Sequence, residues 1–196
     1  AISIGLKGAN MAEYGDMQSA GVVALSDDGK PVMNSHLMRM ALEYAGSLNL
    51  PVISHAEDAD LSAEGLMHEG IVSTELGLPG IPAIAEETMI ARDILLADYT
   101  HTAIHIAHVS TRGAVALIRD AKSRGICVTV ETAPHYFTLS EECLREFDTH
   151  LKVNPPLRSL DDVLAIKEGL RDGTIDAIAS DHAPHAVTEK AVEFEY

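Results

Sequence analysis

Short apolar runs recur along the chain and alternate with longer stretches in which apolar residues return every three or four positions. Runs of the first kind are typical of strands buried in a parallel sheet, and stretches of the second kind are typical of helices that cover such a sheet. The strands are predicted at 21–26, 50–55, 103–108, 126–131 and 175–180, and the helices at 35–48, 83–97, 113–124 and 160–171. The sequence therefore predicts repeated βα units around a parallel sheet.

Polar residues gather at the carboxyl end of every predicted strand, in the segments SDDG, SHAED, AHVST, ETAPHY and SDHAPH. Barrel and open α/β enzymes build their active sites at this end, because the strand-to-helix loops converge there. A closed (β/α)₈ barrel typically takes about 250 residues. A chain of 196 residues with five strands is too short to close one. We therefore expect residues 1–196 to be one partial barrel domain that contains roughly strands 4 to 8 of a TIM-type barrel.

Composition and charge narrow the classes of partner. The formal charge of −16 leaves no concentrated basic face for a nucleic acid, and no apolar run reaches the length of a membrane-spanning helix. The N-terminal stretch has no basic leader followed by a hydrophobic run. Only two cysteines are present, which favours a reducing compartment over a disulfide framework. We expect a globular cytoplasmic protein that acts on a small molecule.

Four residues at the strand ends have the chemistry of metal ligands: Asp28, His55, His108 and Asp181. Neutral imidazole and carboxylate groups bind zinc and similar divalent ions. Taken singly, each has a simpler explanation, because a lone histidine is usually a bystander, Asp28 suits a turn and Asp181 could cap the next helix. The repetition of such residues at successive strand ends favours a metal site.

Further candidates follow the fourth and fifth strands. His182 and His185 accompany Asp181 in DHAPH, and helix capping alone would not require them. Asn154 lies in KVNPPLR, where two prolines fix an extended loop that either holds it over the site or forms a simple turn. His68 is expected on the surface, without a function. Phosphate-loop and serine-nucleophile motifs are absent from the sequence, so metal-assisted hydrolysis remains as the reaction class.

The segments SDDG, SHAED, IAHVST, ETAPHYFTLS, KVNPPLR and IASDHAPH, in this order, resemble those of bacterial-type dihydroorotases of the cyclic amidohydrolase superfamily. The resemblance covers nearly the whole chain. It implies that His55 and His108 bind zinc and that Asp28, the second acid of SDDG, bridges two zinc ions. It also implies that Asp181 is both a zinc ligand and the catalytic proton shuttle.

The same resemblance implies that Asn154 and His185 bind the substrate. The implied reaction is the zinc-dependent, reversible cyclisation of N-carbamoyl-L-aspartate to L-dihydroorotate in de novo pyrimidine biosynthesis. It leaves open a homo-oligomer or a complex with aspartate carbamoyltransferase.

The chain departs from this family pattern because it contains no H-x-H, which full-length members carry on the first barrel strand, and no Pro-Phe-Gly-type loop. We therefore expect the sequence to be a fragment, or to lack segments, and its activity in isolation is doubtful. Two alternatives stay open. One is an allantoinase- or hydantoinase-type cyclic amidase, although those relatives place a carboxylated lysine where SDDG stands here. The other is a non-catalytic scaffold for aspartate carbamoyltransferase, which the retained His55, His108 and Asp181 disfavour.

Overall fold

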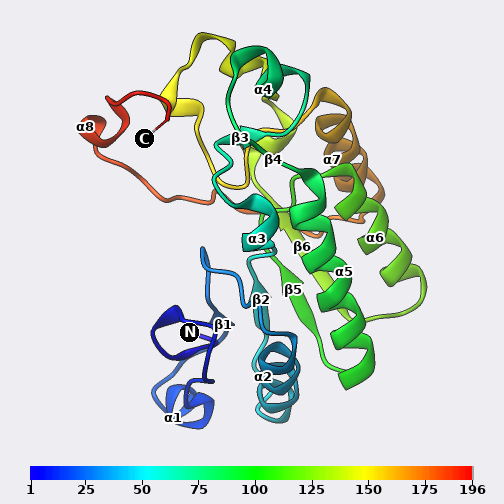
Figure 1. The fold of residues 1–196 in the computed structure, drawn as a ribbon. Helices are drawn as coiled ribbons and strands as arrows, with labels where there is room; N and C mark the ends of the chain where they lie inside the picture. Colours follow the sequence, from blue (N-terminus) through cyan, green and yellow to red (C-terminus); the bar gives the residue numbers. More distant parts are fainter. Residues whose placement is uncertain (196) are drawn as a thin grey trace.

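The five predicted strands form one parallel sheet in the order β1-β2-β5-β6-β7 (Figure 1). The structure is a computed structural model and describes residues 1–195. The strands are β1 (Leu25–Ser26), β2 (Val52–Ser54), β5 (Ile104–Ile106), β6 (Val128–Thr132) and β7 (Ala177–Ile178). Each strand is shorter than predicted. For β1 the reason is that residues 20–21 still turn out of helix α1 (Tyr14–Ser19), with Gly21 at a φ of 94°.

Four long helices connect these strands, as predicted, and lie on one side of the sheet (Figure 1). They are α2 (Ser35–Ser47), α5 (Ala83–Thr100), α6 (Arg112–Ser123) and α7 (Leu160–Asp172). Three of them begin at a side-chain cap, because Asn34, Thr111 and Ser159 each accept hydrogen bonds from backbone N–H groups of the first turn.

The two faces of the sheet differ in burial. Ile104, Ile106 and Val130 point toward the helices and are almost fully buried in the main apolar core. His105 and Thr129 alternate with them along the strands and lie on the other face, where they are only partly covered. A parallel sheet is normally covered on both faces, and in a barrel the second face is the closed interior. The open face of this sheet therefore corresponds to the inside of a partial barrel.

A second, two-stranded parallel sheet is formed by residues that come between β2 and α5 along the chain, and it was not predicted. It consists of β3 (Met67–His68) and β4 (Gly80–Ile81), with α3 (Ala59–Ser62) before it and α4 (Ile71–Leu76) inside it. Unlike β1 and β7, which lie in longer apolar runs, these two strands lie in no continuous apolar run that would predict a strand. The surface position predicted for His68 is wrong, because this residue is 9% exposed and its ring lies against Arg158.

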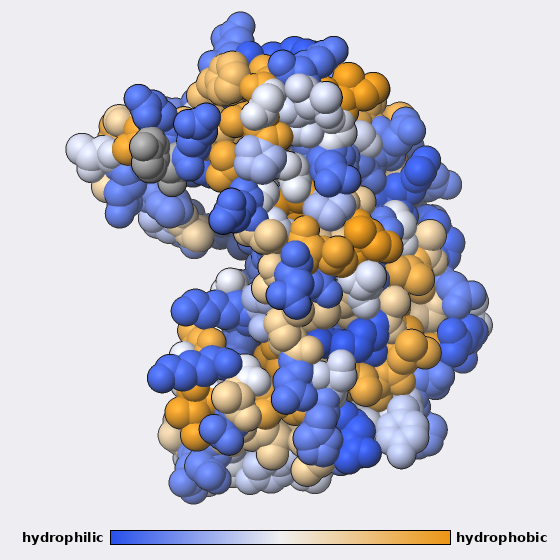
Figure 2. Space-filling view, viewed as in Figure 1, coloured by the Kyte–Doolittle hydropathy of each residue, from blue (hydrophilic) through white to orange (hydrophobic). Residues whose placement is uncertain are grey.

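The remaining elements are short. They are helix α8 (Val187–Lys190) and four 3₁₀ helices at Ile4–Leu6, Pro134–Phe137, Glu141–Glu146 and Thr149–Leu151. Figure 2 shows the molecule hollowed on one side, between the N-terminal part and the C-terminal segment. The loop that follows β1 borders this hollow (Figure 1). Within residues 1–195, no helix is both long enough and apolar enough to cross a membrane.

Candidate metal centre

Three of the four predicted ligands meet at the carboxyl ends of three neighbouring strands. Asp28 follows β1, His55 follows β2 directly, and His108 follows β5. These strands are adjacent in the sheet, so residues far apart in the chain arrive side by side. Asp28 Oδ1 lies 2.9 Å from His55 Nδ1 and 3.4 Å from His108 Nε2, and the two ring nitrogens are 2.8 Å apart.

The two acids of SDDG have different tasks. Asp27 is buried and accepts hydrogen bonds from the backbone N–H groups of Ile2, at 2.7 Å, and Ser3, at 3.1 Å. It also accepts one from the Ser3 hydroxyl, so it fastens the N-terminal segment to the end of β1. Asp28 has no such task, and its carboxylate is directed to the histidines. The second acid is therefore the one available as a ligand.

The donor set of this cluster suits a divalent cation. His55 Nδ1, His108 Nε2 and Asp28 Oδ1 converge on one place, and two nitrogen lone pairs facing each other need a proton or a cation between them. Two imidazoles and a carboxylate are common zinc ligands. The other ring nitrogen of His55, Nε2, lies 3.0 Å from Glu57 Oε2, which is the carboxylate–histidine arrangement found behind metal ligands. The residues present therefore fit a metal ion.

Electrostatics at the cluster also favours positive charge. Burial lowers the pKa of His55, but hydrogen bonds to Asp28 and Glu57 outweigh burial and raise it to about 9. Hydrogen bonds from His108 and His55 hold the pKa of Asp28 well below its usual range. The carboxylates thus stay charged and stabilise a cation between them, whether it is a proton or a metal ion.

Two candidate ligands have a strained backbone. His108 has a φ of 37° and Asp181 a φ of 51°, values that residues with a Cβ rarely adopt. Such a conformation costs about 1–3 kcal/mol and is concentrated at functional sites. Both residues stand shortly after a strand, at the edge of the sheet where the other candidate residues lie.

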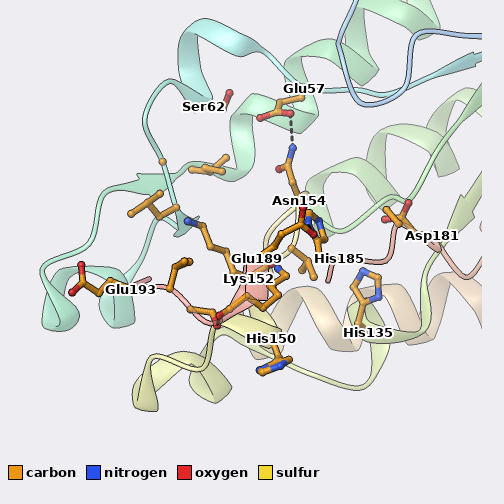
Figure 3. A pocket seen from close by; sticks show the side chains of 18 of the residues that line it. Glu57, Ser62, His135, His150, Lys152, Asn154, Asp181, His185, Glu189 and Glu193 are labelled. Atoms are coloured by element: carbon orange, nitrogen blue, oxygen red, sulfur yellow. Dashed lines mark hydrogen bonds and ion pairs between the residues drawn. The ribbon is translucent and has the colours of Figure 1, made fainter. Parts of the chain in front are cut away.

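A cavity of about 700 Å³ is lined by Glu57, the residue whose carboxylate contacts His55 Nε2 (Figure 3). It is also lined by the other predicted site residues, Asn154, Asp181 and His185. Asn154 is exposed and donates a hydrogen bond from Nδ2 to Glu57 Oε2 at 2.9 Å. Asp181 lines the cavity without joining the cluster of Asp28 and the two histidines within residues 1–195. The structure thus brings together three of the four predicted ligands.

Two further residues at this site were not singled out from the sequence. Glu57 lies two positions after His55 in SHAED, a spacing that places both side chains on one side of an extended segment. His135 follows β6 and lies beside Asp181 in Figure 3. Among the described residues, its Nε2 atom is buried without a hydrogen-bond partner. The repeated occurrence of titratable residues after strands was the available signal for both.

A buried ion pair holds the loop of Asn154 against the end of β5. Arg158, in the same KVNPPLR segment, donates to Ser110 Oγ at 3.0 Å and to the carbonyl of Ile81 at 3.0 Å. Its Nη2 lies 3.5 Å from Glu86 Oε2, and Glu86 in turn accepts the Ser110 N–H at 2.9 Å. Since Ser110 follows His108 by two residues, this network ties the predicted substrate loop to a predicted metal ligand.

Solved structures with a similar fold identify the architecture. A dihydropyrimidinase from Brevibacillus agri superimposes with a TM-score of 0.73 at 24% identity, covering 88% of this chain and 40% of the other. An L-hydantoinase from Arthrobacter aurescens gives a TM-score of 0.72 at 25% identity, covering 91% and 42%. Both are amidohydrolases with a TIM barrel. Fold and site together define this chain as part of such a barrel, with a site that could hold a metal ion.

Sequence comparison specifies the family. The profile of the family described as "Dihydro-orotase-like" matches residues 1–114, and the chain belongs to this family. It is 63% identical to the dihydroorotase of Syntrophus aciditrophicus over 196 residues and 64% identical to that of Pelotomaculum thermopropionicum over 195 residues. Each alignment covers 100% of this chain and 46% of the relative. The chain therefore spans about half the length of these relatives.

Proposed function

We propose that the protein to which this chain belongs is a dihydroorotase, which interconverts N-carbamoyl-L-aspartate and L-dihydroorotate in pyrimidine biosynthesis. The observation that carries the proposal is the convergence of Asp28, His55 and His108 at the strand ends of a chain of the dihydroorotase-like family. Residues 1–196 would be one part of a single barrel domain, and the relatives' additional length accommodates the other strands.

The metal is proposed to be zinc, with two ions in a complete site. Lewis acidity toward water and the amide carbonyl is the chemistry that such ions supply when bound. His55 and His108 would hold one ion through Nδ1 and Nε2, the atoms that face each other here. Asp28 would bridge to the second ion, and its 46% exposed side chain leaves room on the open side of the cluster.

The other site residues would bind substrate and move a proton. Asp181 would complete the ligand set and accept the proton that the carbamoyl nitrogen loses on ring closure, and it would return that proton to the nitrogen in hydrolysis. Its position in the wall of the cavity next to the cluster supports this role. Asn154 and His185 line the same cavity and would orient the substrate there.

A cyclic amidase of the hydantoinase or allantoinase type is less well supported. The hydantoinases share the fold at 21–25% identity, whereas the relatives at 58–64% identity are dihydroorotases. A non-catalytic scaffold is disfavoured because the three clustered ligands are all retained. We propose a cytoplasmic location, which the free, exposed thiols of Cys127 and Cys143 favour. A homo-oligomer or a complex with aspartate carbamoyltransferase is part of the same proposal.

The test is turnover by the full-length, zinc-loaded protein with dihydroorotate, hydantoin and allantoin as separate substrates. We expect hydrolysis of dihydroorotate and its formation from carbamoyl aspartate, both lost after treatment with a chelator and restored by Zn²⁺. Turnover of hydantoin or allantoin without dihydroorotate would overturn the proposal in favour of the other amidases. Absence of turnover with all three would favour the scaffold.

A further inference from the structure

Glu57 contacts both halves of the proposed site, the metal-binding histidine and the substrate loop. A single atom, Oε2, lies 3.0 Å from His55 Nε2 and 2.9 Å from Asn154 Nδ2. Figure 3 shows the second of these contacts. The Glu57 side chain is 18% exposed, so both hydrogen bonds are partly shielded from water. The sequence separation between Glu57 and Asn154 is 97 residues. This contact therefore joins the end of β2 to the loop after β6.

The bond to His55 determines which ring nitrogen is free to bind a metal ion. Glu57 is a carboxylate, so it can only accept, and His55 must donate from Nε2. A neutral imidazole with its proton on Nε2 has its lone pair on Nδ1. That atom is the one that faces Asp28 Oδ1, at 2.9 Å, and His108 Nε2, at 2.8 Å. Glu57 thus selects the tautomer that the proposed metal site requires.

The bond to Asn154 determines how its amide is oriented. With one N–H directed to Glu57, the amide oxygen and the second N–H remain for a ligand in the cavity that Asn154 lines. The asparagine is exposed and directly precedes Pro155 and Pro156 in the loop before α7. Without the carboxylate, rotation of the side chain would be unrestrained on this side. The hydrogen bond therefore orders a group that would otherwise lose entropy on binding.

From this geometry we propose that Glu57 is a positioning residue that couples metal binding at His55 to substrate binding at Asn154. The substrate half rests on the proposed function, whereas the metal half rests on the cluster geometry alone. Removal of a carboxylate behind a metal-binding histidine typically costs about 10–100-fold in metal affinity. Removal of Glu57 is expected to impair both metal affinity and substrate KM, whereas removal of Asn154 is expected to impair KM alone.

The experiment compares Glu57→Ala with Glu64→Ala in the full-length protein. Glu64 is exposed, lies on the same segment and does not line the cavity, so it controls for loss of an acid. Zn²⁺ affinity is measured by competition with a chromophoric chelator, and the Co²⁺-loaded protein gives a visible spectrum of the ligand field. We expect about 10–100-fold weaker Zn²⁺ binding and an altered Co²⁺ spectrum in Glu57→Ala only. Glu57→Gln keeps an oxygen acceptor without charge and should show a smaller loss.

A double-mutant cycle tests the coupling. If both residues act through one hydrogen bond, the KM increases of Glu57→Ala and Asn154→Ala will combine to less than their product in the double variant. Zn²⁺ affinity in Glu57→Ala and Glu57→Gln within threefold of the Glu64→Ala control would overturn the inference. Multiplicative KM effects would likewise overturn the coupling. Both metal measurements need no turnover, so failure of the proposed dihydroorotase activity would be recognised separately.

Discussion

Replacement of Arg158 by methionine removes the cation of a buried ion pair and keeps most of the side-chain volume. Arg158 and Glu86 have side chains that are 2% and 4% exposed, and their charged atoms are 3.5 Å apart. Loss of one partner of a buried pair leaves an uncompensated charge and costs about 3–5 kcal/mol. Glu86 still accepts hydrogen bonds from Ser110 and Thr111, which moderates the penalty. We therefore expect a loss near the lower end, about 3 kcal/mol of unfolding free energy.

The assay is urea unfolding of the full-length protein, followed by circular dichroism. Arg119→Met is the matched control, because Arg119 forms an exposed ion pair with Asp172 at 2.7 Å. Exposed pairs contribute about 0–1 kcal/mol, so this variant should remain close to wild type. Glu86→Gln added to Arg158→Met should restore part of the lost stability, since it removes the orphaned charge. Equal stability of the Arg158→Met and Arg119→Met variants would refute the reasoning.

Four further substitutions each change a single side chain. Asp27→Ala should lower the unfolding free energy by about 1–3 kcal/mol, because the buried N–H groups of Ile2 and Ser3 lose their acceptor. The zinc content should stay unchanged. Loss of zinc would contradict the assignment of Asp27 to structure and Asp28 to metal binding. Burial and Arg158 lower the pKa of His68 below 6.5, so the unfolded chain binds this proton preferentially and stability falls as the pH drops below 6.5. In His68→Gln the urea midpoint of unfolding should fall less between pH 7.5 and pH 5.5 than in the wild type. An equal fall of the midpoint in both proteins would contradict this role of His68. In steady-state kinetics of the full-length protein, Asp181→Asn should nearly abolish kcat and His185→Ala should mainly raise KM, whereas near-normal turnover by Asp181→Asn would contradict its proposed role.

The main sheet and its helices were predictable because their signals are local. Apolar runs and helical spacing are properties of neighbouring residues, and five parallel strands with four helices follow from them. The meeting of Asp28, His55 and His108 was also predictable, since carboxyl ends of adjacent parallel strands share one edge of the sheet.

Other features depend on contacts between distant segments and left no local pattern. Glu57 was not singled out, because its partner Asn154 is 97 residues away along the chain. Arg158 stood in a proline-rich turn, and only the folded chain brings it to Glu86. His68 was placed at the surface because it lies in no continuous apolar run, so nothing local indicates that its ring is buried. Asp181 keeps a predicted role that its place in the cavity wall supports.

The most direct test of the central claim is anomalous diffraction at the zinc absorption edge from crystals of the full-length protein grown with Zn²⁺. The account predicts an anomalous peak bonded to His55 Nδ1, His108 Nε2 and Asp28, the three groups that converge here. It also predicts that Glu57 accepts from His55 Nε2 behind that ion. A zinc-loaded crystal with no peak at these three residues, or with His55 bound through Nε2, would contradict the account.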